Sequence, residues 1–338
     1  MIISNDLSSI GYNTFGIDVT IDTFIELTDK SDLRVIRKNI LESGYYILGG
    51  GSNILLSQNI SKPVIQVNIK GIELLKDAEE YVLVKLAAGE SWHEIVLWAV
   101  AQGYGGIENL SLIPGKCGAA PMQNIGAYGV EIKDVIHAVV AYKLADGNEY
   151  TFHREECGFG YRTSNFKTKW KDDFIITDIV LKLSKPGFHI LNTSYGAIEA
   201  ELQKRAISQP TIEDVSKVVI SIRQAKLPYP DKIGNAGSFF KNPIISIELY
   251  ENLISSYPDM PSYPVDDVSI KVPAGWLIDQ CGWKGRIVGQ TGTYKNQALV
   301  LVNHGKATGA EVFNLSEQIK ASVLAKYQIG LEREVNVW

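Results

Sequence analysis

The chain has 338 residues and 45% of them are hydrophobic, so it can form two or three domains with substantial cores. Its formal net charge of −5 and its lack of any long lysine or arginine block argue against a nucleic-acid-binding surface or an anchor on an anionic membrane. The three cysteines form no CxxC pair and the five histidines have no ligand spacing, so we expect neither a disulfide framework nor a metal site.

The sequence pattern predicts neither a membrane span nor a secretion signal. No apolar run approaches the length of a membrane span, and the first nine residues lack the basic start and apolar centre of a secretion signal. The cysteine usage fits a reducing compartment. We therefore expect a cytoplasmic protein.

The N-terminal part of the chain predicts strands followed by a glycine-rich loop. Alternating and then apolar positions indicate a strand over residues 13–28, with a turn near Asp22. Residues 45–48 and 64–69 predict two more strands, and the first of these runs straight into the run GGGSN. A small β–α–β unit is expected here.

A helix is predicted between those strands, over residues 31–43. Ser31 is placed to cap its start and Gly44 to end it. Its apolar residues recur at helical spacing: Leu33, Ile36, Ile40 and Leu41.

The middle of the chain predicts a strand, a helix and a hairpin. Residues 81–87 form the strand, and the helix after it starts at Ser91-x-x-Glu94, which matches a capping box, and stops at Gly103. The hairpin joins two strands across Asp146-Gly147, a strong turn signal. Its strands, and the strand that follows them, are predicted over residues 135–144, 149–152 and 174–183.

Two further helices are predicted towards the C-terminus, over residues 211–224 and 308–328. Each has one apolar face, and the second begins with the capping box Thr308-x-x-Glu311. A stiff crossing, KLPYP at residues 226–230, indicates a domain boundary. We predict an α+β protein in three parts: residues 1–70, with residues 330–338 possibly returning to that part, then 71–223 and 224–329.

Two glycine-rich loops are the main functional signal. They are ILGGGSN at residues 47–53 and IPGKCGAAPMQNIGAYG at residues 113–129. Glycine, alanine and proline alternate in the second loop without the polar residues of a flexible linker, so an ordered loop close to phosphates or a flat ring is favoured. An irregular crossing between strands is the alternative. Neither loop has the GxGxxG or GxxxxGK[ST] spacing, so a dinucleotide would be held by a non-Rossmann fold.

The two loops resemble the paired FAD-binding loops of the UDP-N-acetylenolpyruvoylglucosamine reductase family. Three downstream motifs resemble the same family: FGYRTSNFK at residues 159–167, GNAGSFFKNP at 234–243 and LEREV at 331–335. The similarity runs from about residue 16 to residue 335. Tyr195 in NTSYGAIEAEL, with PAGWLIDQCGWKG at residues 273–285, is similar to the form of the family that has a tyrosine-bearing substrate loop.

The resemblance implies a three-domain flavoprotein in which two α+β domains bind FAD and a third α+β domain binds substrate. It implies non-covalent FAD, reduced by NADPH, and a second half-reaction in which the enolpyruvyl ether of the nucleotide-sugar becomes a lactyl ether in peptidoglycan precursor synthesis. The expected partners are these small molecules, with no nucleic acid and no membrane anchor, and the expected state is a monomer. The residues implied to bind FAD are Gly49, Gly50, Gly51, Ser52, Asn53, Pro114, Gly115, Gly118, Ala119, Gln123, Asn124, Gly126, Ala127 and Tyr128.

The chemistry implied by the resemblance needs three catalytic residues. Hydride addition leaves negative charge on an enolate conjugated to a carboxylate, and Arg162 offers it a planar two-donor fork. Glu334 would have to be protonated to act as a donor there, which requires a raised pKa. Ser238 matches the donor of a proton to the inner carbon. From spacing alone, Ser238 could instead be a turn serine and Glu334 a surface charge.

The remaining residues implied by the resemblance bind the substrate: Tyr195, Lys226, Asn242, Tyr263, Lys284 and Gln297. The chain ends four residues after Glu334, which leaves the fixing of that residue open, and Cys117 has no assigned role beyond small-residue packing. Two alternatives stay open: another flavoprotein, such as an oxidase of sugars or hydroxy acids, and a non-catalytic module that binds a nucleotide-sugar or a flavin.

Overall fold

The structure is a computed structural model that describes the backbone of residues 1–338 and all side chains except those of residues 38–43. Its chain forms two compact units. Unit 1 comprises Met1–Leu7, Ile21–Gly50 and Ile60–Gln224, and unit 2 comprises Ser8–Thr20, Gly51–Asn59 and Ala225–Trp338. The predicted three-part division stays a prediction. Within the described residues, each helix is too short or too polar to cross a membrane.

Unit 1 begins with a four-stranded sheet in the order β1-β2-β5-β3. Strands β2, β5 and β3 run parallel, and α1 connects β2 to β3. The bounds are β1 Ile2–Ser8, β2 Thr20–Leu27, α1 Asp32–Ser43, β3 Tyr46–Leu48 and β5 Val64–Val67. The predicted β–α–β unit is therefore present.

The predicted first strand is wrong over residues 13–19. There the Asn13 side chain donates to the carbonyls of Ser9 and Ile17 and accepts from the Ile17 N–H, at 2.8–3.0 Å, so it takes the place of a strand partner. In α1, Leu33 and Ile36 are buried as predicted, whereas the Ile40 and Leu41 side chains lie outside the described residues.

Helix caps are predicted less well than helices. Ser31 does not cap α1, because its hydroxyl donates to Asp29, although Gly44 ends the helix with φ 66°. Ser91 precedes α2 (Trp92–Ala101) without a side-chain cap, so that predicted capping box is wrong. The box at Thr308 is confirmed, since Thr308 accepts from the Glu311 N–H and Glu311 accepts from the Thr308 N–H.

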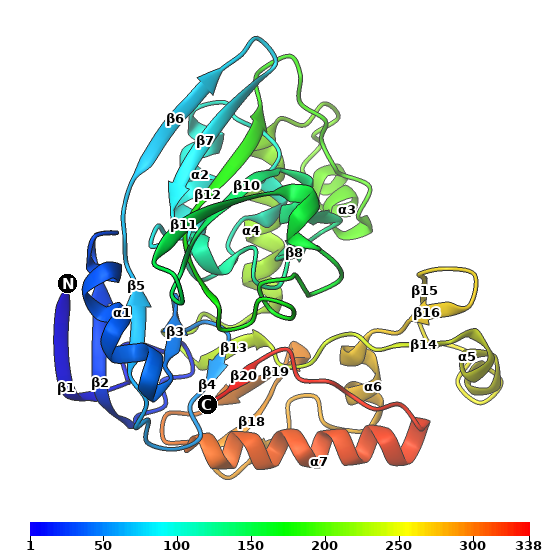
Figure 1. The fold of residues 1–338 in the computed structure, drawn as a ribbon. Coiled ribbons are helices and arrows are strands. Elements are labelled where there is room, and N and C mark those ends of the chain that lie inside the picture. The colour runs from blue at the N-terminus through cyan, green and yellow to red at the C-terminus, as the bar shows by residue number, and fades with distance from the viewer. The chain divides into compact units, whose positions relative to one another are not determined.

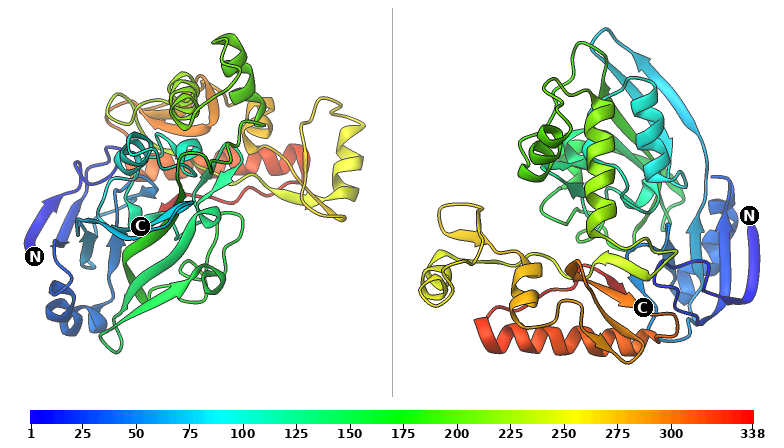
Figure 2. Two further views of the ribbon diagram at one scale, coloured as in Figure 1. Left: turned by 90° about the horizontal axis from the view of Figure 1, so that it is seen from above. Right: turned by 180° about the vertical axis from the view of Figure 1, so that it is seen from behind.

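The larger part of unit 1 is a five-stranded antiparallel sheet in the order β11-β10-β12-β7-β6. Helices α2 and α4 lie side by side over one face of it, as the right-hand view of Figure 2 shows. The predicted hairpin is β10 and β11, with Gly147 at φ 79° in its turn. The bounds are β6 Ile72–Asp77, β7 Tyr81–Ala87, β10 Ile136–Lys143, β11 Asn148–His153, β12 Phe174–Ser184, α3 Gly196–Lys204 and α4 Ile212–Lys226.

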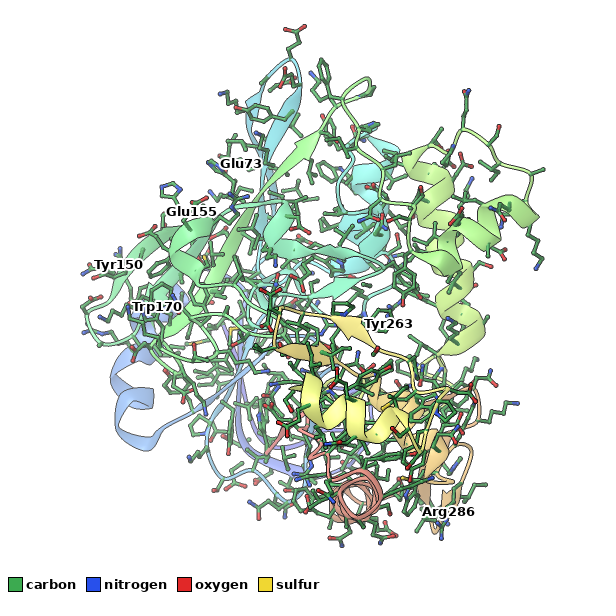
Figure 3. The ribbon with its side chains drawn as sticks, turned by 90° about the vertical axis from the view of Figure 1, so that its right-hand side faces the viewer. Glu73, Tyr150, Glu155, Trp170, Tyr263 and Arg286 are labelled. Carbon is green, nitrogen blue, oxygen red and sulfur yellow. The ribbon has the colours of Figure 1, made fainter. Side chains whose placement is uncertain are left out.

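The core of this sheet explains why its strands were predictable. Alternate residues of β7, namely Val82, Val84 and Leu86, are fully buried and pack in one cluster with Trp92 and Val96 of α2. Figure 3 labels Tyr150, which lies on β11, and Trp170, which lies between β11 and β12. The ring centroids of Phe152 and Trp170 are 4.4 Å apart. Short elements between the strands are β8 Gly126–Ala127, β9 Val130–Glu131 and the 3-10 helices Glu108–Leu110, Cys117–Ala119, Ile132–Asp134 and Arg154–Cys157.

Unit 2 is built on a four-stranded sheet in the order β13-β19-β18-β17, with α7 along it (Figure 1). A three-stranded sheet, β14-β16-β15, carries α5, and β20 pairs with β4 in parallel. The bounds are β4 Ile54–Leu55, β13 Gly234–Ser238, β14 Ile244–Ser246, α5 Ile247–Ile254, β15 Tyr263–Pro264, β16 Ser269–Lys271, α6 Ala274–Gln280, β17 Ile287–Val288, β18 Thr291–Tyr294, β19 Gln297–Asn303, α7 Gly309–Tyr327 and β20 Asn336–Val337.

Candidate functional site

The two glycine-rich loops meet in unit 1. A Cβ placed on Gly50 would lie 2.9 Å from the Gly115 Cα, and one on Gly49 would lie 3.4 Å from the Ala119 Cβ. Real Cβ atoms do not approach a backbone atom as closely as 2.9 Å, so Gly50 is needed for this contact. The predicted pairing of the loops is therefore present, since their main chains are in contact.

The second loop is fastened to the sheet by its own backbone. The Cys117 N–H donates to the Glu90 carbonyl and the Gly118 N–H donates to the Ala88 carbonyl, both at 2.9 Å. A Cβ on Gly118 would lie 2.6 Å from the Ala88 Cβ, which requires glycine there. Cys117 is fully buried, and this burial raises the pKa of its thiol, so it is a packing residue rather than a nucleophile.

Positive charge lies beside the first loop. The stem of Lys116 packs within 3.6 Å of the position that a Cβ on Gly50 would occupy. Burial lowers the pKa of Lys116, and the nearby charge of Lys70 lowers it further, while Glu90 opposes the shift. Lys70 itself is 3.5 Å from the Glu90 carboxylate. Two lysines and one glutamate give the region beside Gly50 a net positive charge, which suits a bound anion.

The FGYRTSNFK segment is tied to the second loop by four hydrogen bonds. Asn124 is fully buried, and both it and Arg162 have left-handed backbones, with φ 48° and 55°. The bonds run from Asn124 Nδ2 to the Gly160 carbonyl, from an Arg162 Nη to the Gly126 carbonyl, from Ser164 Oγ to the Met122 carbonyl and from Lys167 Nζ to Gln123 Oε1, at 2.7–3.2 Å. Arg162 is thus positioned directly on the predicted flavin loop.

The end of the second loop holds the predicted substrate tyrosine. The rings of Tyr128 and Tyr195 meet edge to face, with centroids 5.3 Å apart. Asn109 donates to the carbonyls of Tyr128 and Asn192, at 3.0 and 2.8 Å, and Asn192 donates to the Gly129 carbonyl at 3.0 Å. Sequence reasoning missed Asn109 and Asn192, because an isolated asparagine carries no motif.

Ser238 and Glu334 come together in unit 2. The Glu334 N–H donates to the Phe239 carbonyl at 2.9 Å, so the predicted catalytic serine and glutamate lie on adjoining segments. The pairing of β13 with β19 is irregular between Asn235 and Ser238, and such an irregularity re-aims the residues beside it. Ser238 is exposed at the end of a strand and Glu334 is half-buried.

The C-terminus is held although it is short. Strand β20 pairs with β4, and the Asn336 N–H donates to the Asn53 carbonyl at 3.1 Å. Asn53 Nδ2 donates to the Glu334 carbonyl at 3.3 Å, and the Trp338 N–H donates to the Leu55 carbonyl at 2.9 Å. The residues around Glu334 are therefore fixed by main-chain and side-chain hydrogen bonds of Asn53, in the GGGSN loop.

Two predicted substrate residues meet at the start of α6. Asn242 Oδ1 accepts from the Ala274 N–H at 2.9 Å, and a Cβ on Gly275 would lie 2.8 Å from Gln297 Oε1. Lys284 instead forms an exposed ion pair of 3.0 Å with Asp279, towards the other end of that helix. Lys226 is exposed at the end of α4. Tyr263, which is labelled in Figure 3, lies on β15 and is 53% exposed.

The loops fit the expected flavin dinucleotide. At Gly50 and Gly115 the two loops meet main chain to main chain, and Lys116 and Lys70 add positive charge beside them. A pyrophosphate is the part of FAD that such a surface would bind.

Comparison with known proteins gives consistent matches along the chain. The model of an FAD binding domain matches residues 22–152, and that of the UDP-N-acetylenolpyruvoylglucosamine reductase C-terminal domain matches residues 228–338. Relatives named UDP-N-acetylenolpyruvoylglucosamine reductase are 48% identical in Flavobacterium johnsoniae, over 100% of both chains, and 44% identical in Pseudomonas aeruginosa, over 97% of this chain and 96% of the relative.

A solved structure supports the fold. The UDP-N-acetylenolpyruvylglucosamine reductase from Thermus caldophilus matches with a TM-score of 0.69 and 24% identity, over 100% of this chain and 98% of that one. The mixed α+β architecture predicted from sequence is confirmed by this likeness.

Proposed function

The chain belongs to the UDP-N-acetylenolpyruvoylglucosamine reductase family, and from this we propose which of its residues carry the reaction. The protein is an FAD-dependent oxidoreductase that uses NADPH to reduce UDP-N-acetylenolpyruvoylglucosamine to UDP-N-acetylmuramate in peptidoglycan synthesis. This family membership excludes the two alternatives, an oxidase of sugars or hydroxy acids and a non-catalytic binding module. The roles of the individual side chains in this reaction are our proposal.

The two glycine-rich loops would hold the cofactor. Gly49 and Gly50 pack against Gly115 and Ala119, and main-chain amides of the two loops, with Lys116 beside them, would bind its pyrophosphate. When bound, FAD supplies the redox chemistry, accepting hydride from NADPH and delivering it to the enolpyruvyl group. The wider set of predicted FAD residues, from Ser52 to Tyr128, stays a proposal.

Arg162 would stabilise the charge that develops on the substrate. Its guanidinium is already fixed by the Gly126 carbonyl at 3.0 Å, so little reorganisation is needed when charge appears. The guanidinium presents a planar fork to the carboxylate and to its enolate form. The left-handed backbone at Arg162 is the kind of strain that is found at functional sites.

Ser238 and Glu334 would complete the second half-reaction. The single observation that carries this proposal is the 2.9 Å hydrogen bond from the Glu334 N–H to the Phe239 carbonyl, which brings the two segments together. Ser238 would donate the proton to the inner carbon, because an enolate carbon is a strong enough base to take it from an aligned hydroxyl. Glu334 would act as a protonated donor beside the developing charge.

The other predicted residues would bind the nucleotide-sugar. Tyr195 and Lys226 would contact its diphosphate, while Asn242, Tyr263, Lys284 and Gln297 would surround the rest. Asn242 and Gln297 both contact the start of α6, which supports a shared role. We also propose that the protein is cytoplasmic, since its cysteine usage fits a reducing compartment, and that it acts as a monomer.

An anaerobic titration in two stages tests these assignments. NADPH is added first and the enolpyruvyl nucleotide-sugar second, while the flavin absorbance is followed. In Ser238→Ala and Glu334→Gln, flavin reduction should proceed as in the unaltered protein, whereas reoxidation by substrate should slow by roughly 100-fold or more. The exposed Ser256→Ala serves as the matched control and should change neither stage.

Three outcomes would contradict the proposal. Equal loss in both stages would indicate a folding defect rather than a lost proton donor. Full second-stage activity in either variant would remove that residue from the mechanism. In a separate run with air admitted after NADPH, reoxidation by oxygen that outpaces reoxidation by the enolpyruvyl substrate would favour an oxidase.

A further inference from the structure

Arg223, on the last turns of α4, contacts both ends of the second glycine-rich loop. Its Nε donates to the Leu112 carbonyl at 3.3 Å, just before the loop begins. Its guanidinium is also within hydrogen-bonding reach of the Tyr128 hydroxyl, at the end of the loop. The side chain is largely buried but keeps an exposed part. No sequence motif pointed to this residue.

Arg162 reaches the same short stretch of chain from another element. Its Nη donates to the Gly126 carbonyl at 3.0 Å, two residues before Tyr128. The two arginines are close enough that the charge of Arg162 adds to burial in lowering the pKa of Arg223, while Tyr128 opposes the shift. Two guanidinium groups therefore share one partly desolvated corner of unit 1.

Two guanidinium groups in one partly desolvated corner suit an anionic ligand. Among the described residues, no carboxylate forms an ion pair with Arg223, and the charged or polar groups that shift its pKa are Tyr128 and Arg162. Like charges in a desolvated site repel, so a negatively charged group between them is strongly favoured. An arginine needed only to hold the Leu112 carbonyl would not have to lie beside a second arginine.

The neighbouring rings indicate which ligand would supply that anion. Tyr128, which holds Arg223, packs edge to face on Tyr195, the residue proposed to close over the substrate. Tyr128 has φ 50°, an unfavourable backbone for an aromatic residue, and the Asn109 side chain fixes its carbonyl. Tyr128 thus contacts both Arg223 and Tyr195, the proposed substrate residue.

We propose that Arg223 is a further substrate-binding residue, which acts with Arg162 as a pair of guanidinium groups on an oxyanion of the nucleotide-sugar and is held in place by Tyr128. This inference rests on the proposed function, because it takes the ligand to be the enolpyruvyl nucleotide-sugar. The oxyanion is either the diphosphate or the enolpyruvyl carboxylate, and both present the oxygen geometry that a guanidinium fork binds.

The test compares Arg223→Met, Arg223→Lys and Tyr128→Phe with the unaltered holoenzyme. Dissociation constants are measured by titration calorimetry for UDP, for UDP-N-acetylglucosamine and for the enolpyruvyl nucleotide-sugar with oxidised enzyme. Arg223→Met should weaken binding roughly 10- to 100-fold, as expected for a lost charge-assisted hydrogen bond. Arg223→Lys should recover part of that loss, and Tyr128→Phe should lose less than Arg223→Met because the charge remains.

The three ligands identify the oxyanion. Weaker binding of all three in Arg223→Met places the guanidinium on the diphosphate, and weaker binding of the enolpyruvyl compound alone places it on the carboxylate. Both results support the proposal. Unchanged affinity for all three ligands would overturn it, as would an Arg223→Lys variant no better than Arg223→Met.

Bound FAD separates substrate binding from loop support. The FAD content and the rate of flavin reduction by NADPH are measured for each variant. Arg223→Met should keep its FAD, since the contacts at Gly50 and Gly118 remain. Loss of FAD in proportion to the loss of nucleotide affinity would show that Arg223 only supports the loop. Failure of the proposed function is seen separately, as failure of the unaltered enzyme to be reoxidised by the enolpyruvyl substrate.

Discussion

Leu112 shows how single side chains position the flavin loop. Its backbone is left-handed, with φ 58°, which costs a residue with a large side chain on the order of 1–2 kcal/mol. The cost is offset on both sides of the residue: His93 Nδ1 accepts from the Leu112 N–H at 2.9 Å, and Arg223 donates to its carbonyl. The start of the loop therefore depends on two side chains from different helices.

His93 should make the stability of unit 1 depend on pH. Burial lowers the pKa of His93 below 6.5, with Glu94 opposing and Arg223 reinforcing the shift, and protonation of Nδ1 would remove the acceptor for Leu112. A depressed folded-state pKa means that the stabilisation is complete above pH 6.5 and is lost as the pH falls through the folded-state value. His93→Gln keeps an acceptor without titrating there. We expect its free energy of unfolding to fall less steeply below pH 6.5 than that of the unaltered protein, as measured by urea denaturation.

Neither His93 nor Arg223 could be assigned from sequence. Each is one polar residue on an otherwise well-predicted helix, where an exposed position is the ordinary expectation. Their role depends on the fold of a loop between residues 103 and 135, which no periodicity describes. Ser238 and Glu334 were found only because they lie in long motifs, and their adjacency depends on a bond from Glu334 to Phe239 across distant segments.

Elements were predictable where burial alternates along them. Strand β7 has the predicted bounds, because Val82, Val84 and Leu86 are all buried on one face. Strand β1 was missed because IISNDLS is exposed or half-exposed throughout and carries no such alternation. The predicted Ser31 cap is wrong for a different reason: the Ser31 hydroxyl donates to Asp29 instead, and sequence spacing does not indicate that competition.

The contact between the two loops gives a test of the cofactor cradle. Gly50→Ala would place a Cβ 2.9 Å from the Gly115 Cα, so the main chain must shift where the pyrophosphate is proposed to lie. We expect FAD to bind at least about tenfold more weakly, or ~1.4 kcal/mol, with the fold retained. FAD affinity is measured by quenching of flavin fluorescence in the apoprotein.

A matched glycine serves as the control for that experiment. Gly196 begins α3, has open space around its Cβ position and has no positive φ. Gly196→Ala should leave the affinity for FAD unchanged. If Gly50→Ala bound FAD as tightly as Gly196→Ala does, the close approach of the loops would not form the cofactor site.

Unit 2 is assembled from three separate stretches of chain, although the family model of its domain covers only residues 228–338. Residues 8–20 supply a buried Phe15, whose carbonyl accepts from Asn303 at 2.9 Å, and the Thr14 carbonyl accepts from the Asn235 N–H at 2.9 Å. Residues 51–59 supply β4, the partner of β20, and the buried Leu55 and Leu56. A boundary search along the sequence cannot reveal these contributions, because both stretches are short and lie within the FAD-binding half.

A polypeptide of residues 225–338 should therefore not fold alone. It would leave the partners of Phe15 and Leu55 exposed and β20 without a neighbour, and large buried side chains are each worth about 2–5 kcal/mol. We expect a poorly dispersed amide NMR spectrum and no cooperative unfolding. A polypeptide in which residues 8–20 and 51–59 are joined to it by glycine-rich linkers should recover dispersed signals. Dispersed signals from residues 225–338 alone would instead show that the C-terminal part folds independently, as the predicted three-part division requires.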